Sequence, residues 1–119
     1  MIAGIGVDLV SVSDFREQFY TGSTFAEAFS GAELREARRR AEVSGDLAQH
    51  LAGRWAAKEA FVKAWFAADG QVMAPEELCW DSLQVLGAPP RLHVPVDYRS
   101  HVSISHDGGF ATAMVVLEQ

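Results

Sequence analysis

The central stretch of the sequence, residues 51–65 (LAGRWAAKEAFVKAW), limits the possible folds more than any other segment. At about 100° per residue, the bulky apolar side chains in and around it fall on one stripe of a helix. The stripe consists of Leu47, Leu51, Trp55, Val62, Trp65 and Phe66. We predict a long helix that starts at Ser44 or Asp46 and ends near residues 69–70. Lys58 projects from the middle of the stripe, where a pure core helix would not carry an ammonium group, so it is a candidate functional residue.

Glu59 and Lys63 lie one helical turn apart, beside a face occupied only by the small side chains of Ala52, Ala56 and Ala60. Such a low face lets another backbone or a ligand approach closely. The spacing fits a surface ion pair, which stabilises a helix by roughly 0.2–0.5 kcal/mol. It also fits the wall of an active site, and the spacing alone favours the surface pair.

The composition describes one ordinary globular domain. The chain has 119 residues, of which 49% are hydrophobic and 22% charged, so it can bury a core without disulfides or metal. The single Cys79 has no partner for an internal disulfide and no neighbouring zinc ligands, which predicts a reducing, cytoplasmic setting. No apolar run approaches the roughly 18 residues of a membrane span, and no basic leader precedes the first apolar segment. We expect no membrane partner.

The net charge of −6 argues against non-specific nucleic-acid binding. The charges are unevenly distributed along the chain. Residues 35–63 carry seven basic and four acidic side chains, whereas the remainder carries three basic and twelve acidic ones. An anionic ligand therefore has one plausible location, on or near the central helix.

Residues 2–10 (IAGIGVDLV) are predicted to form a buried strand, with Ile5, Val7 and Leu9 on one face. Asp8 ends the opposite row, whose earlier members Gly4 and Gly6 have no side chain. Glycines in a strand commonly mark the close approach of a backbone or ligand. Asp8 is therefore either a ligand for a hard cation or a hydrogen-bonded structural carboxylate, and the strand alone leaves both open. The GIG triplet lacks the context of a dinucleotide-binding motif.

Two capping patterns predict the helices that follow. Ser11 and Asp14 open a short helix over residues 11–20, which breaks at residues 21–23. One or two helical turns follow at residues 24–29. Ser30 and Glu33 form a capping box that opens a helix to about Val43, and the arginines at residues 38–40 suit its solvated C-terminal end.

The last third of the chain predicts strands joined by turns. We expect strands at residues 80–86, 91–96, 101–106 and 110–117, with turns at 75–77, 87–90 and 107–109. His106 then precedes a tight turn at the rim of the sheet, where it either meets a ligand or is an ordinary surface residue. The expected fold is an α+β domain with a small hairpin-rich sheet packed on one long central helix.

Several of these side chains would form a coherent site if Asp8 and Glu59 converge. Two carboxylates with open positions fit Mg²⁺ held partly by substrate phosphates. Arg54, Lys58 and Lys63 would then neutralise phosphate charge, as phosphoryl transfer requires. No serine elbow or Cys/His pattern indicates nucleophilic catalysis by the protein.

Three separated segments, GIGVDLV, LAGRWAAKEAFVKAW and HVSISH, resemble those of the holo-acyl-carrier-protein synthases. These enzymes are the short branch of the 4′-phosphopantetheinyl transferases, and their fold is α+β. The resemblance spans nearly the whole chain, and the segment from residue 12 to 37 is most similar to actinobacterial members.

The resemblance implies transfer of the 4′-phosphopantetheine arm of coenzyme A to a serine of an acyl carrier protein or of a fatty acid synthase carrier domain. Adenosine 3′,5′-bisphosphate would be released. It also implies Mg²⁺ on Asp8 and Glu59, and a homotrimer with the site between subunits. Glu59 or a metal-bound water would accept the serine proton. Phosphate contacts are implied for Arg54, Lys58, Lys63 and His106.

Two features depart from the family pattern. Only ten residues separate Pro90 from His101, which questions a helical turn before the strand at 101–106. The first helix carries Asp14 and Glu17 against Arg16, whereas the carrier-docking helix of the family is typically more basic.

An alternative function is a module that binds coenzyme A or a related nucleotide without turnover. Both functions need the basic residues, but only the enzyme needs the carboxylate pair.

Overall fold

The computed structural model describes residues 1–21, 24–71 and 73–119. The predicted break at residues 21–23 therefore lies partly outside the described chain. The elements in chain order are β1 (Ile2–Ser11), α1 (Val12–Tyr20), η1 (Thr24–Ala28), α2 (Gly31–Ser44), α3 (Leu47–Asp69), η2 (Pro75–Glu77), η3 (Trp80–Ser82), β2 (Gln84–Leu86), β3 (Arg91–His93), β4 (Arg99–Asp107) and β5 (Phe110–Glu118).

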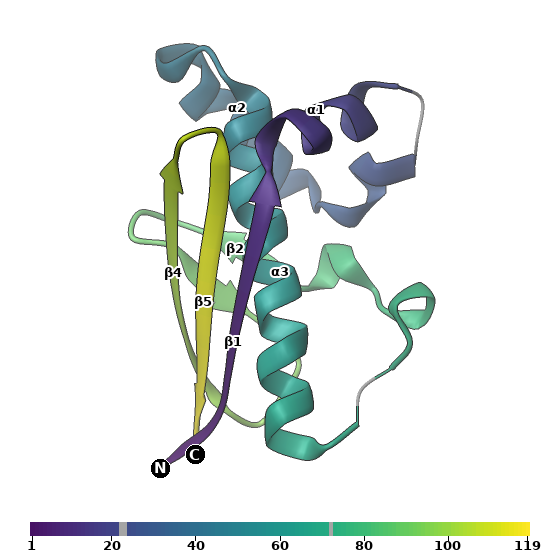
Figure 1. Cartoon of the computed structure of the whole chain (residues 1–119), viewed down its shortest axis with the longest axis vertical. Helices are drawn as coiled ribbons and strands as arrows, with labels where there is room; N and C mark the ends of the chain where they lie inside the picture. The colour runs from purple at the N-terminus through teal and green to yellow at the C-terminus, as the bar shows by residue number, and fades with distance from the viewer. Residues whose placement is uncertain (22–23, 72) are drawn as a thin grey trace.

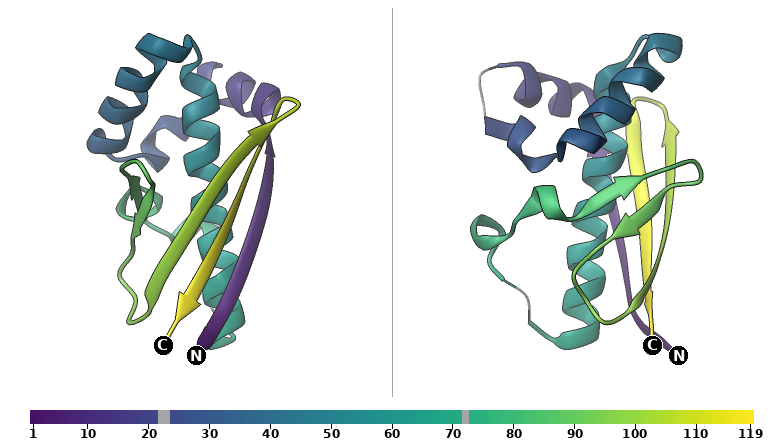
Figure 2. Two further views of the ribbon diagram at one scale, coloured as in Figure 1. Left: turned by 90° about the vertical axis from the view of Figure 1, so that its left-hand side faces the viewer. Right: turned by 180° about the vertical axis from the view of Figure 1, so that it is seen from behind.

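The long helix α3 lies along one face of an antiparallel sheet with strand order β1-β5-β4 (Figure 1). A separate two-stranded hairpin, β2-β3, and the helices α1 and α2 surround the same helix. No described element covers the other face of the three-stranded sheet (Figure 2). The predicted α+β fold, with a small sheet packed on one central helix, is confirmed. None of the described helices is long and apolar enough to cross a bilayer.

Strand β1 packs directly on the backbone of α3. A Cβ atom on Gly4 would lie 2.1 Å from the carbonyl oxygen of Ala64, and one on Gly6 would lie 1.9 Å from that of Ala60. Only glycine fits at these positions, because such distances are far inside van der Waals contact. The alanine face of α3 is therefore the face that meets the sheet.

This packing corrects the prediction of a single bulky core stripe on the central helix. Buried residues occur all round α3, including Leu51, Phe61 and Ala57, while Phe66 of the predicted stripe is 57% exposed. The helix is enclosed by the sheet on one side and by α2, β2 and η3 on others. Because several of its faces are buried, the spacing of its bulky apolar residues could not show which face meets the sheet.

The prediction of a buried strand at residues 2–10 holds for only one face of β1 in this chain. Because side chains alternate along a strand, packing Gly4 and Gly6 on α3 turns Ile5, Val7 and Leu9 outward. Val7 pairs with Met114 of β5, and both are about half exposed. We call this surface the outer sheet face; its exposed apolar members are Ile5, Val7, Leu9, Phe110 and Met114.

The predicted helix starts are confirmed. The Asp14 N–H donates to Ser11 Oγ, and the capping box of Ser30 and Glu33 is complete. Asp46, rather than Ser44, caps α3 by accepting from the Gln49 N–H. The helix ends at Asp69 and is capped by Gly70, whose φ of 79° is favourable for glycine.

The predicted strand at residues 80–86 is shorter than expected, because it begins as the helical turn η3 and only residues 84–86 pair with β3. The strand at 91–96 likewise ends at His93. The short connection from β3 to β4 contains no helical turn. The Tyr98 hydroxyl within it donates to Asp69 at the end of α3.

Candidate active site

Asp8 and Glu59 do converge, at the β1 edge of the sheet. Asp8 is on the inner face of β1, opposite Ala113, and its carboxylate accepts from Lys63 Nζ at 2.9 Å. The same ammonium donates to the Val7 carbonyl at 3.0 Å. Lys63 is largely exposed, whereas the Asp8 side chain is only 12% exposed. Lys63 thus forms its ion pair with Asp8, and Glu59 is the third member of the same cluster.

The pKa of Glu59 is raised well above its ordinary value. Burial raises its pKa to about 7, with further contributions from the negative charge of Asp8 and a hydrogen bond between the two carboxyl groups. Lys63 opposes this shift without cancelling it. Two carboxyl groups held this close repel each other when both are ionised, and a divalent cation would relieve that repulsion.

The chemistry of this cluster fits Mg²⁺ better than a transition metal. Both donors are hard carboxylate oxygens, which magnesium prefers. No group of three or more His, Cys, Asp or Glu side chains that could hold a metal occurs in the described ranges. Asp8 and Glu59 could therefore supply at most two ligands to such an ion, with its other positions open to phosphate oxygens.

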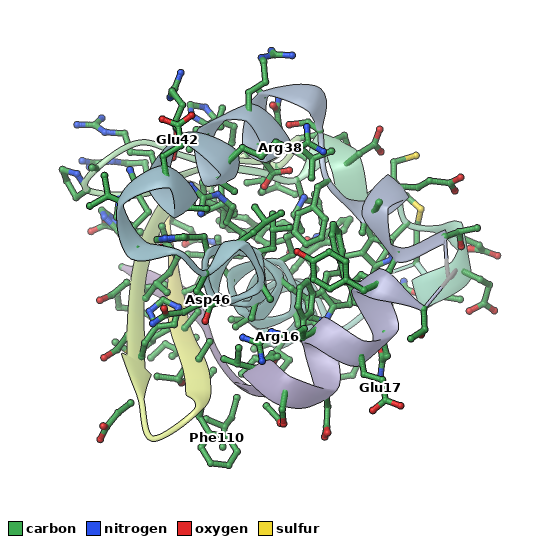
Figure 3. The ribbon with its side chains drawn as sticks, turned by 90° about the horizontal axis from the view of Figure 1, so that it is seen from above. Arg16, Glu17, Arg38, Glu42, Asp46 and Phe110 are labelled. Carbon is green, nitrogen blue, oxygen red and sulfur yellow. The ribbon has the colours of Figure 1, made fainter. Side chains whose placement is uncertain are left out.

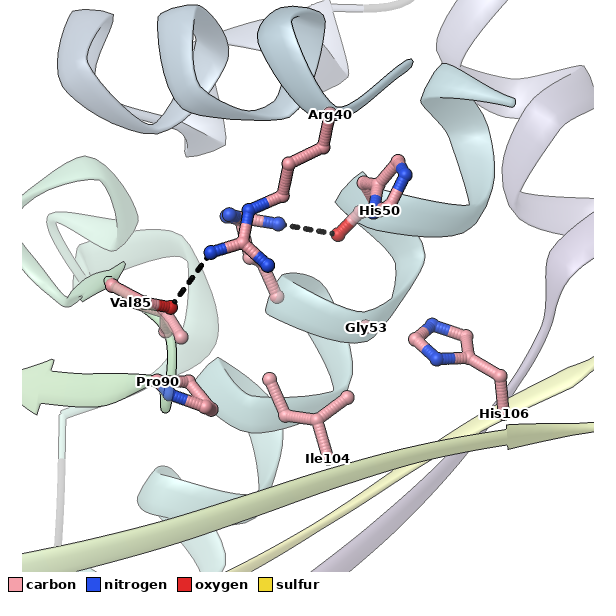
Figure 4. Close-up of a pocket in the computed structure, with 9 residues that line it drawn as sticks. Arg40, His50, Gly53, Val85, Pro90, Ile104 and His106 are labelled. Carbon is pink, nitrogen blue, oxygen red and sulfur yellow. Dashed lines mark hydrogen bonds between the residues drawn. The ribbon is translucent and has the colours of Figure 1, made fainter. Parts of the chain in front are cut away.

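A cationic cavity of about 170 Å³ lies beside the β4 edge of the sheet (Figure 4). Its polar walls come from Arg40 of α2, from His50 and Arg54 of α3, and from His106 of β4. His106 Nε2 donates to the Gln49 carbonyl at 3.0 Å. Gly53 makes room for this ring, because a Cβ atom there would lie 2.9 Å from His106 Nε2.

Arg54 is fixed within the cavity wall. It is 6% exposed, and its guanidinium donates to Glu36 Oε1 at 2.6 Å and to the His50 carbonyl at 3.1 Å. Its Nε is the single buried side-chain polar atom without a hydrogen-bond partner in the described chain. Burial lowers the pKa of His50, and the positive charges of Arg54, Arg40 and His106 lower it further. The cavity is therefore suited to an anion.

The carboxylate cluster and the cationic cavity lie on different sides of α3. Arg54 and Glu59 are five residues apart, which separates them by about 140° around a helix. The cluster adjoins β1 and the cavity adjoins β4, with β5 between these strands. One chain thus presents two separate halves of a possible site.

The sequence model of the 4′-phosphopantetheinyl transferase superfamily matches residues 4–115. The chain belongs to this superfamily. A Corynebacterium glutamicum holo-[acyl-carrier-protein] synthase is 43% identical over 131 residues, which cover 95% of this chain and 96% of that protein. The Mycobacterium tuberculosis protein of the same name is 39% identical, covering 98% and 97%. The resemblance seen in the sequence is therefore confirmed, and the chain is an enzyme of this type.

Solved structures of the superfamily share the fold. The ACPS–CoA complex of Chronobacterium ammoniagenes has a TM-score of 0.85 and 39% identity, covering 96% of this chain and 95% of that one. The acyl carrier protein synthase of Mycobacterium tuberculosis has a TM-score of 0.72 and 32% identity, covering 99% and 98%.

Lys58, for which the family resemblance implied a phosphate contact, is not free to make one in this phosphopantetheinyl transferase. Lys58 is 0% exposed, and its ammonium donates to Glu33 Oε1 at 2.8 Å and to the carbonyls of Ala28 and Trp80 at 2.8 and 2.7 Å. All three protons are used, so the expected phosphate contact from Lys58 is wrong. The lysine instead ties α3 to α2, η1 and η3.

Two cavity residues of this transferase were not identified from the sequence. Arg40 was grouped with Arg38 and Arg39 at a solvated helix end, but its guanidinium donates to the Gly87 carbonyl at 3.0 Å. His50 precedes Arg54 by one turn of α3. That i,i+4 spacing is the signal that could have revealed His50, whereas Arg40 depends on the position of the β2–β3 turn.

Proposed function

We propose that this enzyme transfers the 4′-phosphopantetheine group of coenzyme A to a serine of an apo acyl carrier protein or of a fatty acid synthase carrier domain. The reaction depends on Mg²⁺ and releases adenosine 3′,5′-bisphosphate. The observation that carries the proposal is the Asp8–Glu59 carboxyl pair beside Lys63. The names of the relatives and the coenzyme A complex of the Chronobacterium ammoniagenes protein support it.

Asp8 and Glu59 would hold the Mg²⁺ ion, which supplies positive charge for the pyrophosphate of coenzyme A. Lys63 already lies between solvent and Asp8, so it can turn to a phosphate oxygen and balance charge there. The serine oxygen forms the new P–O bond, and the bond to the departing adenosine 3′,5′-bisphosphate breaks. The serine proton passes to Glu59 or to solvent beside it.

The cationic cavity would bind the 3′-phosphate of coenzyme A, which stays on the adenosine together with the 5′-phosphate. The pyrophosphate has to lie at the carboxylate pair, so Arg54 and His106 are left for the 3′-phosphate. Arg40 adds a third donor to the same wall. The unpartnered Nε of buried Arg54 supports an anion in this position.

The same separation supports a homotrimer with sites between subunits. The carboxylate pair of one copy and the cavity of a neighbour would together bind one coenzyme A. The outer sheet face offers a contact surface, because five large apolar side chains are exposed on it. Burying such a patch between copies is favourable.

The carrier would approach Glu59 through a small groove next to it. This groove has a volume of about 200 Å³ and includes Phe25, Trp55 and Gln18 in its walls. Phe15 of α1 also lines this groove, but only 3% of it is exposed, so it offers a carrier little contact area. Arg16, the basic residue of α1, forms two hydrogen bonds of 3.0 Å with Asp46 (Figure 3). The surface of α1 therefore offers an acidic carrier little attraction.

In the decisive experiment, the protein is incubated with coenzyme A, Mg²⁺ and an apo carrier protein, and the molecular mass of the carrier is then measured. A mass gain of one phosphopantetheine that EDTA abolishes is expected. Tight coenzyme A binding without transfer to any carrier would instead support the binding module.

Asp8→Ala and Glu59→Ala should abolish this transfer while the fold is retained, because neither side chain belongs to the apolar core. Asp97→Ala, at an exposed carboxylate that belongs neither to the carboxylate cluster nor to the cavity wall, is the matched control and should keep full activity. A variant that unfolds, yet keeps full activity per folded molecule, would show that its residue is structural.

A further inference from the structure

Glu36 links three elements behind the cationic cavity. Its carboxylate accepts from Arg54 of α3 at 2.6 Å and lies 3.4 Å from Arg40 of α2. It also accepts the Gly87 N–H, at 3.1 Å to one oxygen and 3.2 Å to the other. One side chain therefore fixes both arginines relative to the β2–β3 turn.

The turn itself is part of the cavity wall. Gly87 and Pro90 line the cavity, and the Gly87 carbonyl accepts from Arg40 (Figure 4). Gly87 is thus held by Glu36 through its N–H and by Arg40 through its carbonyl. Removing the carboxylate would release the turn and one end of the Arg54 guanidinium together.

Glu36 is ionised and acts from outside the cavity. Burial alone would raise its pKa, but hydrogen bonds from Gly87 and Arg54, with the charges of Arg54 and Arg40, outweigh burial and lower it. Its side chain is 13% exposed and is not among the residues that line the cavity. Because it does not touch a ligand in the cavity, it can position a bound anion only through the arginines and the turn, and any other influence would come from its charge.

We propose that Glu36 is a positioning residue that gives the cavity its selectivity for the 3′-phosphate of coenzyme A. The inference rests on the proposed function, because that function supplies the ligand. Glu36 orients Arg54 and Arg40 toward one phosphate group. A pair of pre-oriented guanidinium groups binds a phosphate dianion more tightly than mobile ones, because less side-chain freedom is lost on binding.

The test compares the binding of adenosine 3′,5′-bisphosphate and adenosine 5′-monophosphate by calorimetry. The two nucleotides differ only in the 3′-phosphate, so the ratio of their dissociation constants measures selectivity. Glu36→Ala removes the carboxylate, and Glu36→Asp retracts it from its partners while keeping the charge. Both should reduce the ratio about tenfold, with most of the loss on the bisphosphate.

Glu36→Gln separates positioning from charge. Its amide oxygen can still accept from Arg54 and Gly87, so the ratio should stay within about threefold of the wild-type value. Glu42→Ala is the matched control: Glu42 is an exposed carboxylate on the same helix (Figure 3) and is not among the residues that line the cavity. It should leave the ratio unchanged.

Each other outcome is informative. If Glu36→Ala and Glu36→Gln both tighten bisphosphate binding, Glu36 acts only by its charge and the proposal fails. Equal weakening of both nucleotides would indicate a merely structural role and also overturn it. A wild-type enzyme that transfers phosphopantetheine without preferring the bisphosphate would refute the placement of the 3′-phosphate and the role of Glu36, but not the activity. Absence of transfer and of nucleotide binding would refute the proposed function itself.

Discussion

Gly6 of β1 and Ala60 of α3 are in backbone contact: a Cβ atom on Gly6 would lie 1.9 Å from the Ala60 carbonyl oxygen. This contact keeps Asp8, two residues along the strand, beside Glu59, one residue before Ala60. The glycine row therefore sets the separation of the carboxylate pair.

Gly6→Ala should destabilise the protein by at least about 2 kcal/mol, because strand or helix must move to admit one methyl group. Urea unfolding measures the effect. Gly31→Ala is a suitable control, since its Cβ would meet only the flexible end of Arg35, at 3.1 Å. An equally small effect at both glycines would show that β1 is not held against α3 in this way.

Lys58→Met should cost about 3–5 kcal/mol, because it leaves the carboxylate of Glu33 buried without its counter-ion. Both side chains of this pair are 0% exposed. Adding Glu33→Gln to Lys58→Met should recover part of the loss, which a double-mutant cycle from thermal unfolding would measure. A stable Lys58→Met variant with a raised KM for coenzyme A would instead restore the phosphate role.

The apparent affinity for Mg²⁺ should rise with pH across neutrality. The pKa of Glu59 is raised to about 7, so at pH 6 a proton must leave before the carboxylate can bind a cation. From pH 6 to pH 8 we expect about a tenfold gain, measured as the Mg²⁺ concentration that gives half-maximal transfer. Asp8→Asn should reduce this dependence, because it removes the negative charge that helps to raise the pKa of Glu59.

The same shift determines how stability depends on pH without metal. The folded pKa of Glu59 lies above its ordinary value of 4.5, so the stability linked to its proton is present below pH 4.5 and is lost as pH rises through about 7. Thermal unfolding in EDTA should show a decline over this interval that Glu59→Gln removes. No decline would mean that Glu59 titrates normally.

Val7→Glu should dissociate the expected trimer, because it places a charge in the middle of the outer sheet face. Sedimentation equilibrium at micromolar concentration would detect the loss of mass, and transfer activity should fall with it. Val43→Glu makes the same substitution at a side chain that is 93% exposed on α2 and should leave assembly intact. A wild-type monomer would refute the trimer directly.

Much of the fold follows from local patterns in the sequence. The capping box of Ser30 and Glu33 acts over three residues, and the hairpin at 107–109 is likewise set by its own backbone. The small face of the central helix and the glycines of β1 indicated a close approach, which the structure shows between these two elements. Asp8 and Glu59 could therefore be selected as candidates from their own segments.

Only the tertiary structure decided which charges are available to a ligand. Lys58 and Glu33 are 25 residues apart, and nothing local indicates that the lysine is neutralised by a buried carboxylate. Arg40 reaches the cavity because Gly87, 47 residues later, lies beside it. A charge placed on a helix can face solvent, a ligand or a distant counter-ion with the same sequence spacing. The free energy that separates these outcomes comes from burial and from non-local hydrogen bonds, and these exist only once the chain has folded.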